Sequence, residues 1–208
     1  MDTKQLQLWK SSFGADYAGR PGNALSAENL RCLMRDWGRM LAHAVTPRPE
    51  SVLEVGCNIG RNLVALRSFV GEIHAVEPNA EAVEQARANP ALEGIDIREG
   101  DGFALPFPDA SVDLVFTSGV LIHVAPEDLE RVVQEIARVA RHYILCIEYF
   151  SHEPVQAAYR GKEGYLFKRD FGRFYLEKFT DLRVLDYGFL WQPLDSSDNS
   201  NWWLFAKR

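Results

Sequence analysis

The sequence has few cysteines and no long uncharged apolar run, and both absences narrow the class of protein. Three cysteines, Cys32, Cys57 and Cys146, occur in 208 residues. Their odd number and spacing fit neither a disulfide framework nor a zinc site, so we expect buried free thiols. No uncharged apolar stretch approaches the ~18–20 residues that cross a bilayer. The opening residues MDTKQLQLWK lack the apolar core of a secretory signal. We therefore expect a soluble, cytoplasmic protein without a membrane partner.

An excess of basic residues is also missing. The formal net charge is −6, which argues against nucleic acid as a partner. The composition is that of a globular protein, and the length fits one domain. We expect a single domain over 1–208, as a monomer or homodimer. It divides into an N-terminal helical cap (1–48), a cofactor-binding core (49–150), and an acceptor-side insert with a C-terminal hairpin (151–208).

Strand and helix patterns alternate through the middle of the chain. Short apolar or alternating segments predict five strands, at 51–56, 72–77, 95–99, 112–116 and 143–147. Apolar residues at helical spacing predict helices at 26–45, 62–69, 80–88 and 126–140. This alternation is typical of an α/β fold in which helices cover both faces of a parallel sheet.

The last quarter of the chain follows a different pattern. A polar stretch interrupted by glycine reaches Gly164, and a helix is expected at 170–179. Aromatic-rich strands follow at 182–190 and 202–206, close enough in sequence to form a hairpin. The final strand is therefore expected to be antiparallel.

A glycine-containing turn follows the first strand, with the form E-x-G-x-x-x-G at Glu54, Gly56 and Gly60. Such a turn lets a ligand approach the backbone and the start of the next helix. Arg61-Asn62 after Gly60 excludes a phosphate-binding P-loop, and the glycine pattern of a dinucleotide loop is incomplete.

Two further acids suggest which ligand this turn serves. Glu77 ends the second strand, 21 residues after Gly56, and suits the two hydroxyls of a ribose. Asp101 follows the third strand and can accept a hydrogen bond from an adenine amino group. The pattern indicates an adenosine without a pyrophosphate.

These residues, in this order, resemble the class I S-adenosylmethionine-dependent methyltransferases over about residues 45–150. The resemblance implies S-adenosylmethionine as cofactor and a Rossmann-like, mostly parallel seven-stranded sheet. The implied strand order is 3-2-1-4-5-7-6, with strand 7 antiparallel and an N-terminal helical lid. The residues expected to bind the cofactor are Tyr17, Arg20, Glu54, Gly56, Cys57, Asn58, Gly60, Glu77, Pro78, Asp101, Gly102, Thr117, Ser118 and Gly119.

A narrower resemblance spans nearly the whole chain. The opening Trp9, Phe13, Tyr17 and Arg20 and later segments are similar to a methyltransferase group associated with pseudaminic acid biosynthesis and surface polysaccharides. The later segments are 166–171, 185–189 and 203–205. This association favours an acceptor related to surface polysaccharides or nonulosonic acids, but the resemblance does not specify the acceptor itself.

The acceptor side is expected in the insert, which carries cations and aromatic residues in an otherwise acidic chain. Its expected substrate-binding residues are Tyr159, Arg160, Tyr165, Lys168 and Arg169. They would hold a small anionic or sugar-derived molecule. The alternative is a solvated surface loop and helix start.

His123 is the first candidate for a catalytic base, because imidazole titrates near neutrality. Glu148 and Tyr149, at the end of the fifth strand, are the next candidates. His123 could instead be packed beneath the cofactor. No metal is expected, since no acid or histidine cluster has obvious ligand spacing.

The function expected from the sequence is methyl transfer to oxygen or nitrogen of a small molecule. A protein or RNA methyltransferase, or an inactive cofactor-binding partner subunit, remain alternatives.

Overall fold

A seven-stranded sheet forms the centre of the molecule. The computed structural model describes residues 2–20, 26–194 and 198–208. The strands of the sheet, in chain order, are β1 (Ser51–Val55), β2 (Glu72–Glu77), β3 (Asp96–Glu99), β4 (Val112–Ser118), β5 (Ala140–Glu148), β8 (Leu182–Leu190) and β9 (Ser200–Lys207). Their spatial order is β3-β2-β1-β4-β5-β9-β8, and only the pairings of β9 with β5 and β8 are antiparallel. The expected order and the antiparallel final strand are confirmed.

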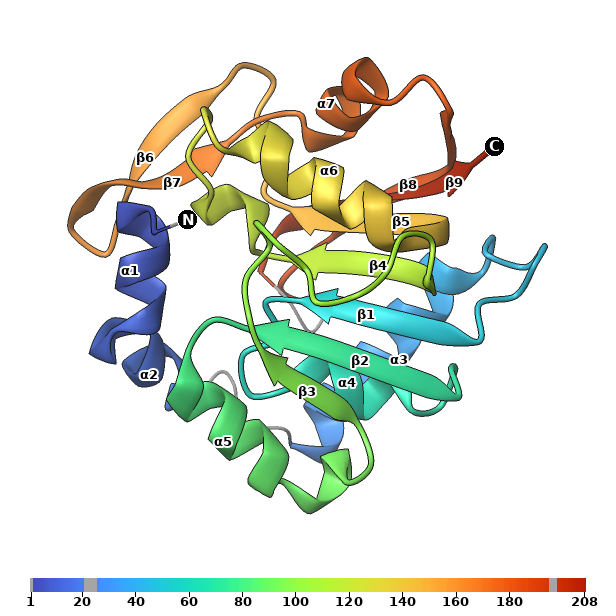
Figure 1. Cartoon of the computed structure of the whole chain (residues 1–208), viewed down its shortest axis with the longest axis horizontal. Helices are drawn as coiled ribbons and strands as arrows, with labels where there is room; N and C mark the ends of the chain where they lie inside the picture. Colours follow the sequence, from blue (N-terminus) through green and yellow to red (C-terminus); the bar gives the residue numbers. More distant parts are fainter. Residues whose placement is uncertain (1, 21–25, 195–197) are drawn as a thin grey trace.

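Helices cover both faces of this sheet (Figure 1). They are α3 (Ala27–Leu41), α4 (Arg61–Leu66), α5 (Ala80–Ala88), α6 (Leu129–Val139) and α7 (Phe171–Lys178), with short 3-10 turns η2 (Pro90–Leu92) and η3 (Leu121–His123). Side chains alternate between faces along each strand. Leu114 and Phe116 of β4 therefore pack with α3 and α4, whereas Val115 packs with α6 and α7. The α/β fold class is thus explained by two apolar cores on opposite sides of one sheet.

Helix starts follow the capping residues of the sequence. The side chain of Ser26 accepts a hydrogen bond from the backbone N–H of Asn29 and begins α3, as predicted. Asn79 caps α5 in the same way through Ala82, and Asp170 caps α7 through Arg173. The ends are less well predicted, since α3 stops at Leu41 rather than near 45. Of the expected buried thiols, Cys57 and Cys146 are buried but Cys32 is half-buried.

Two additions stand at the carboxyl ends of the parallel strands (Figure 1). One is the N-terminal pair of helices, α1 (Lys4–Lys10) and α2 (Ser12–Ala18). The other is a separate hairpin of β6 (Val155–Tyr159) and β7 (Lys162–Lys168), where the sequence predicted only a polar stretch. The side-chain amide of Gln5 donates a 3.0 Å hydrogen bond to the carbonyl of Gly164, joining the two additions. Together they stand over the sheet edge where α/β folds bind ligands.

None of the described helices has the length and apolar character that a bilayer crossing requires.

Trp37 packs α3 against the sheet. It is 1% exposed, and its ring meets that of Phe116 edge-on at 4.7 Å. We expect Trp37→Ala to lower the free energy of unfolding by about 3–5 kcal/mol, because it leaves a large cavity between helix and sheet. Urea denaturation monitored by circular dichroism measures this change. Tyr187→Ala, at a residue 71% exposed, is the control and should change stability by less than about 0.5 kcal/mol. Equal effects of the two variants would contradict this packing role.

Candidate functional site

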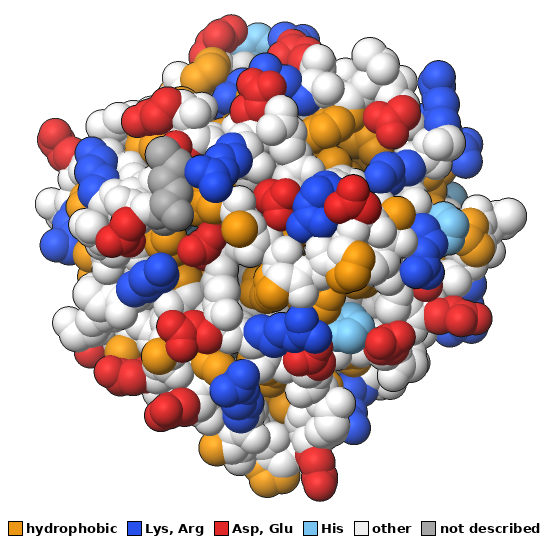
Figure 2. All heavy atoms as spheres, in the orientation of Figure 1, with side chains coloured by type: hydrophobic (Ala, Val, Ile, Leu, Met, Phe, Trp, Pro, Cys, Tyr) orange, Lys and Arg blue, Asp and Glu red, His pale blue; other side chains and the backbone are white. Residues whose placement is uncertain are grey.

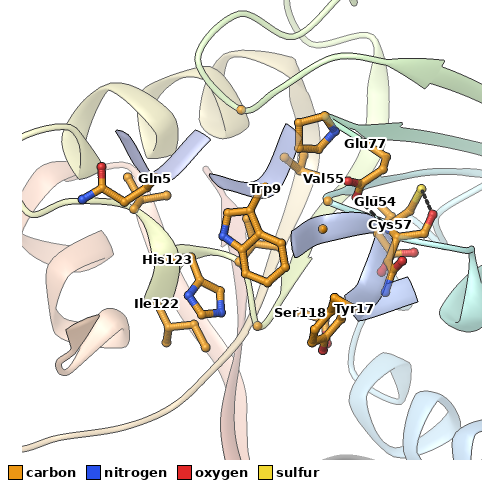
Figure 3. A pocket seen from close by; sticks show the side chains of 18 of the residues that line it. Gln5, Trp9, Tyr17, Glu54, Val55, Cys57, Glu77, Ser118, Ile122 and His123 are labelled. Carbon is orange, nitrogen blue, oxygen red and sulfur yellow. Dashed lines mark hydrogen bonds between the residues drawn. The ribbon is translucent and has the colours of Figure 1, made fainter. Parts of the chain in front are cut away.

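A cavity of about 900 Å³ lies between the carboxyl ends of the central strands and the helices α1 and α2. Most of the expected site residues line it: Tyr17, Arg20, Glu54, Gly56, Cys57, Asn58, Glu77, Pro78, Asp101, Gly102, Ser118, Gly119, His123, Tyr149, Tyr159 and Arg160. Six do not: Gly60, Thr117, Glu148, Tyr165, Lys168 and Arg169. In the close view, Glu54, Glu77 and Cys57 gather at one end and His123 lies toward the other, with Trp9 between them (Figure 3).

The glycine turn after β1 needs its glycines for two reasons. Gly56 and Gly60 have φ near +80°, a conformation that side chains disfavour. A Cβ at Gly56 would also lie 2.6 Å from Cγ2 of Val120. The N–H groups of Gly56 and Cys57 donate to the carbonyl of Val76 at 2.8 and 3.1 Å, which ties the turn to β2. The turn is therefore held between β2 and the loop that follows β4.

Glu77 is buried at the end of β2 and holds the turn on one side and α5 on the other. One carboxylate oxygen accepts from the N–H of Asn58 at 2.8 Å and the other from the N–H of Asn79 at 3.0 Å. Burial raises its pKa, and the two backbone donors oppose that rise. Each oxygen has a second lone pair, so the carboxylate can still accept from two ligand hydroxyls.

Glu54 is almost fully buried at the end of β1. Its Oε1 accepts from the side-chain amide of Asn62 at 2.7 Å, whereas Oε2 has no hydrogen-bond partner among the described residues. Burial raises the pKa of this carboxyl to about 8, so it is mostly protonated at pH 7. A buried oxygen of this kind suits a cationic or hydrogen-bond-donating ligand group.

The third acid, Asp101, lies in the turn after β3. Its Oδ1 accepts from the N–H of Phe103 at 2.9 Å, and Oδ2 is 3.9 Å from the Nζ of Lys10 on α1. Gly102 beside it has no room for a side chain, because a Cβ would approach Val132 at 2.9 Å. Asp101 thus lines the cavity and faces the N-terminal helices.

His123 is buried in a wall of aromatic rings. Its ring centroid is 4.7 Å from that of Trp9 and 4.6 Å from that of Tyr159. Nδ1 is 2.7 Å from the carbonyl oxygen of Tyr165. A carbonyl only accepts, so Nδ1 carries the proton and the neutral ring has its lone pair on Nε2. Burial lowers the pKa to about 4, which keeps this imidazole neutral at pH 7.

The other two expected catalytic residues do not match a role as base. Glu148 lies outside the cavity, and its oxygens accept from the backbone N–H groups of Val120, Leu121 and Ile122. Tyr149 does line the cavity, but its hydroxyl donates to Asp198 at 2.7 Å, and burial raises its pKa. Both side chains are already engaged within the protein.

The expected acceptor residues divide between two environments. Tyr159 and Arg160, at the end of β6 and the hairpin turn, line the cavity. Arg169 stacks on Phe174 at 4.1 Å, and Lys168 lies 5.4 Å from the ring centroid of Tyr149. Tyr165 contributes its backbone carbonyl to His123 rather than a side chain to the cavity.

Several lining or supporting residues were not expected from the sequence. Trp9 lies in an N-terminal segment that stands out in the sequence for its aromatic residues. The contact of Trp9 with His123 could not be predicted from that composition. Asn79 donates from its side chain to the carbonyls of Trp9 and Ser11 at 2.9 and 3.1 Å. It follows Glu77 by two residues, which was the only available signal. Arg61 and Asp198 also line the cavity.

Within the described ranges, no three His, Cys, Asp or Glu side chains group closely enough to hold a metal ion.

Comparison with known proteins finds several methyltransferases. Residues 53–145 match the family described as "Methyltransferase domain". The chain is 29% identical over 126 residues to the Bacillus subtilis protein named "Uncharacterized methyltransferase YcgJ", covering 58% of this chain and 49% of that one. It is 30% identical over 170 residues to the probable chloroplastic tocopherol O-methyltransferase of Oryza sativa, covering 74% and 46%. The chain thus spans less than half the length of both curated relatives.

A solved structure agrees over nearly the whole fold. It is the 1,6-didemethyltoxoflavin-N1-methyltransferase of Burkholderia thailandensis, with a TM-score of 0.72, 18% identity, and coverage of 97% of this chain and 88% of that one. At this identity the likeness concerns the fold. Residues 53–145 thus match the methyltransferase-domain family in sequence, and nearly the whole chain shares its fold with a solved methyltransferase.

Proposed function

We propose that this protein transfers a methyl group from S-adenosylmethionine to an oxygen or nitrogen of a small anionic, ring-containing metabolite. The observation that carries the proposal is the single cavity that joins buried acids at one end to the neutral His123 at the other. When bound, S-adenosylmethionine supplies a methyl group already activated on a sulfonium. The chain's task is to hold the two molecules and accept a proton.

The residues at the acidic end fit this cofactor. Glu77 has lone pairs for the two ribose hydroxyls, and Asp101 and the N–H of Gly102 would serve the adenine. Glu54 Oε2, without a partner among the described residues, suits the ammonium of the methionine part. Nη1 of Arg20 is buried, faces the same cavity and has no hydrogen-bond partner in the described ranges, which suits the carboxylate.

The acceptor is proposed to lie beside Trp9, His123 and Tyr159. Aromatic faces of Trp9 and Tyr159 suit a ring, and Nε2 of His123 can accept the proton that an attacking hydroxyl loses. Arg160 supplies positive charge at the same end of the cavity. A sugar-derived acid, which the narrower resemblance favours, would satisfy all three features.

Two features favour a small acceptor over a macromolecule. The helices α1 and α2 cover the cavity, and Gln5 fastens them to the hairpin at Gly164. In addition, acidic and basic side chains are interspersed over the face drawn in Figure 2, unlike the continuous basic patch typical of nucleic-acid binding.

The affinity for S-adenosylmethionine should depend on pH through Glu54. The free carboxyl has a pKa of about 8, and a bound cation favours its ionised form. Below pH 8 binding must release a proton, so Kd should rise by about tenfold per pH unit on acidification. Calorimetry from pH 6 to 8.5 measures this, and Kd of Glu54→Gln should change much less over this range than Kd of the wild-type protein. A pH-independent Kd for the wild-type protein would contradict this role.

His123→Ala should lower kcat by about 100-fold for an oxygen acceptor, because proton removal loses its base. Affinity for S-adenosylhomocysteine should stay within about twofold. Turnover is measured with sugar acids, hydroxy acids and nucleotide sugars as acceptors. His152→Ala is the control, because that side chain is 84% exposed and lies outside the cavity. Wild-type kcat in His123→Ala would exclude His123 as the base.

Arg160→Ala tests the anionic character of the acceptor. With an active acceptor from the same panel, KM for that acceptor should rise by about 10–100-fold, the effect of losing a charge-assisted contact. Affinity for S-adenosylhomocysteine should be unchanged. Lys162→Ala removes an exposed cation from the same hairpin and should have no effect. If only proteins or RNA were methylated, or nothing was, the small-molecule proposal would fail.

A further inference from the structure

Glu148 is a buried acid that the proposed chemistry leaves unused. It ends β5 and is 0% exposed. Its Oε1 accepts from the N–H groups of Val120 and Leu121 at 3.1 and 3.0 Å, and Oε2 accepts from that of Ile122 at 3.3 Å. A single side chain thus binds three consecutive backbone donors in the loop after β4. The carboxylate supplies the hydrogen-bond acceptors that these N–H groups do not find within the irregular loop.

The bound segment contacts both ends of the cavity. Val120 packs on the glycine turn so closely that a Cβ at Gly56 would lie 2.6 Å from its Cγ2. Ile122 lines the cavity, and His123 follows it directly with its ring against Trp9 and Tyr159. Any shift of residues 120–123 would therefore move the wall of the proposed cofactor site and the proposed base together.

We propose that Glu148 is a positioning residue, whose ionised carboxylate holds residues 120–122 so that Val120 supports the glycine turn and His123 faces the cavity. The effect of Glu148 on methyl transfer rests on the proposed function, whereas its hydrogen bonds to the N–H groups of residues 120–122 do not. Glu148 acts through the loop and touches neither cofactor nor acceptor.

The same geometry makes these three hydrogen bonds sensitive to pH. Burial raises the pKa of Glu148 to about 7, and the three backbone donors oppose that rise by favouring the charged form. Protonation converts one carboxylate oxygen into an O–H donor that faces N–H groups. The hydrogen bonds to the loop therefore weaken as pH falls through this value. The titratable groups facing it are Cys146 on β5 and Tyr175 on α7. The pKa of each is raised by burial, so both stay neutral near pH 7.

A pH titration of the wild-type protein tests directly whether Glu148 holds residues 120–122. Amide chemical shifts of Val120, Leu121 and Ile122, followed by nuclear magnetic resonance from pH 5.5 to 8.5, should move together with one midpoint near 7. Amides of Leu114 to Phe116 in β4 should not follow that midpoint. If the three loop amides do not respond, or respond with different midpoints, the proposal is overturned. This measurement requires neither a variant nor a ligand.

Glu148→Gln tests the consequence for binding. The amide group mimics the protonated acid, so Kd for S-adenosylhomocysteine at pH 8 should rise by about tenfold. The ratio of variant to wild-type Kd should then shrink toward one at pH 6. Glu54 also titrates, but it is present in both proteins and cancels in the ratio. Glu153→Gln, at an exposed acid that follows β5, is the matched control and should match the wild type.

The outcomes separate the two proposals. A constant ratio across this pH range, or equal Kd values at pH 8, would overturn the positioning role of Glu148. Failure of the wild-type protein to bind S-adenosylhomocysteine would overturn the proposed function instead, and the amide titration would still decide the role of Glu148. The titration also decides it if Glu148→Gln does not fold.

Discussion

Among the described residues, three glutamate carboxyl groups are buried where the parallel strands end, and each needs hydrogen-bond partners in place of water. Glu54, Glu77 and Glu148 stand at the carboxyl ends of β1, β2 and β5. Glu77 and Glu148 meet the need with backbone N–H groups of neighbouring loops. These bonds give the glycine turn and the loop after β4 their shape. Glu54 is only half satisfied, and its remaining oxygen is the feature that calls for a ligand.

The helices α1 and α2 and the hairpin depend on this frame. Asn79, whose N–H donates to Glu77, also donates from its side chain to the carbonyls of Trp9 and Ser11. On the opposite side, successive residues of β7 accept from Gln5 and His123 through Gly164 and Tyr165. The cover of the cavity is thus joined both to Glu77, the proposed ribose-binding acid, and to the proposed base. A ligand that contacts Glu77 would share a hydrogen-bonded network with Trp9.

The sheet could be predicted from the sequence because the buried strands and the helices that cover them have recognisable patterns of apolar residues. Apolar strands separated by amphipathic helices specify the order of elements, and the positions of Glu54, Glu77 and Asp101 relative to the strands specify the ligand end. The hairpin has no such pattern, since no residue of β6 is buried and only Gly164 and Leu166 of β7 are buried. The role of Tyr165 was also hidden, because every residue has a carbonyl and only the fold decides which one meets His123. Glu148 was predicted as a candidate base from its place at a strand end, but an acid there can face the cavity or the neighbouring loop, and Glu148 faces the loop. Lys168 and Arg169 carry the expected charge but pack against Tyr149 and Phe174.

The central claim is that the acids around the glycine turn bind the nucleoside of S-adenosylmethionine with its reactive end toward His123. A crystal structure of the protein with S-adenosylhomocysteine tests it most directly. The account predicts both ribose hydroxyls within hydrogen-bond distance of Glu77 and the sulfur between Glu54 and the aromatic wall of Trp9, His123 and Tyr159. A nucleoside bound elsewhere, or one whose ribose does not contact Glu77, would contradict it.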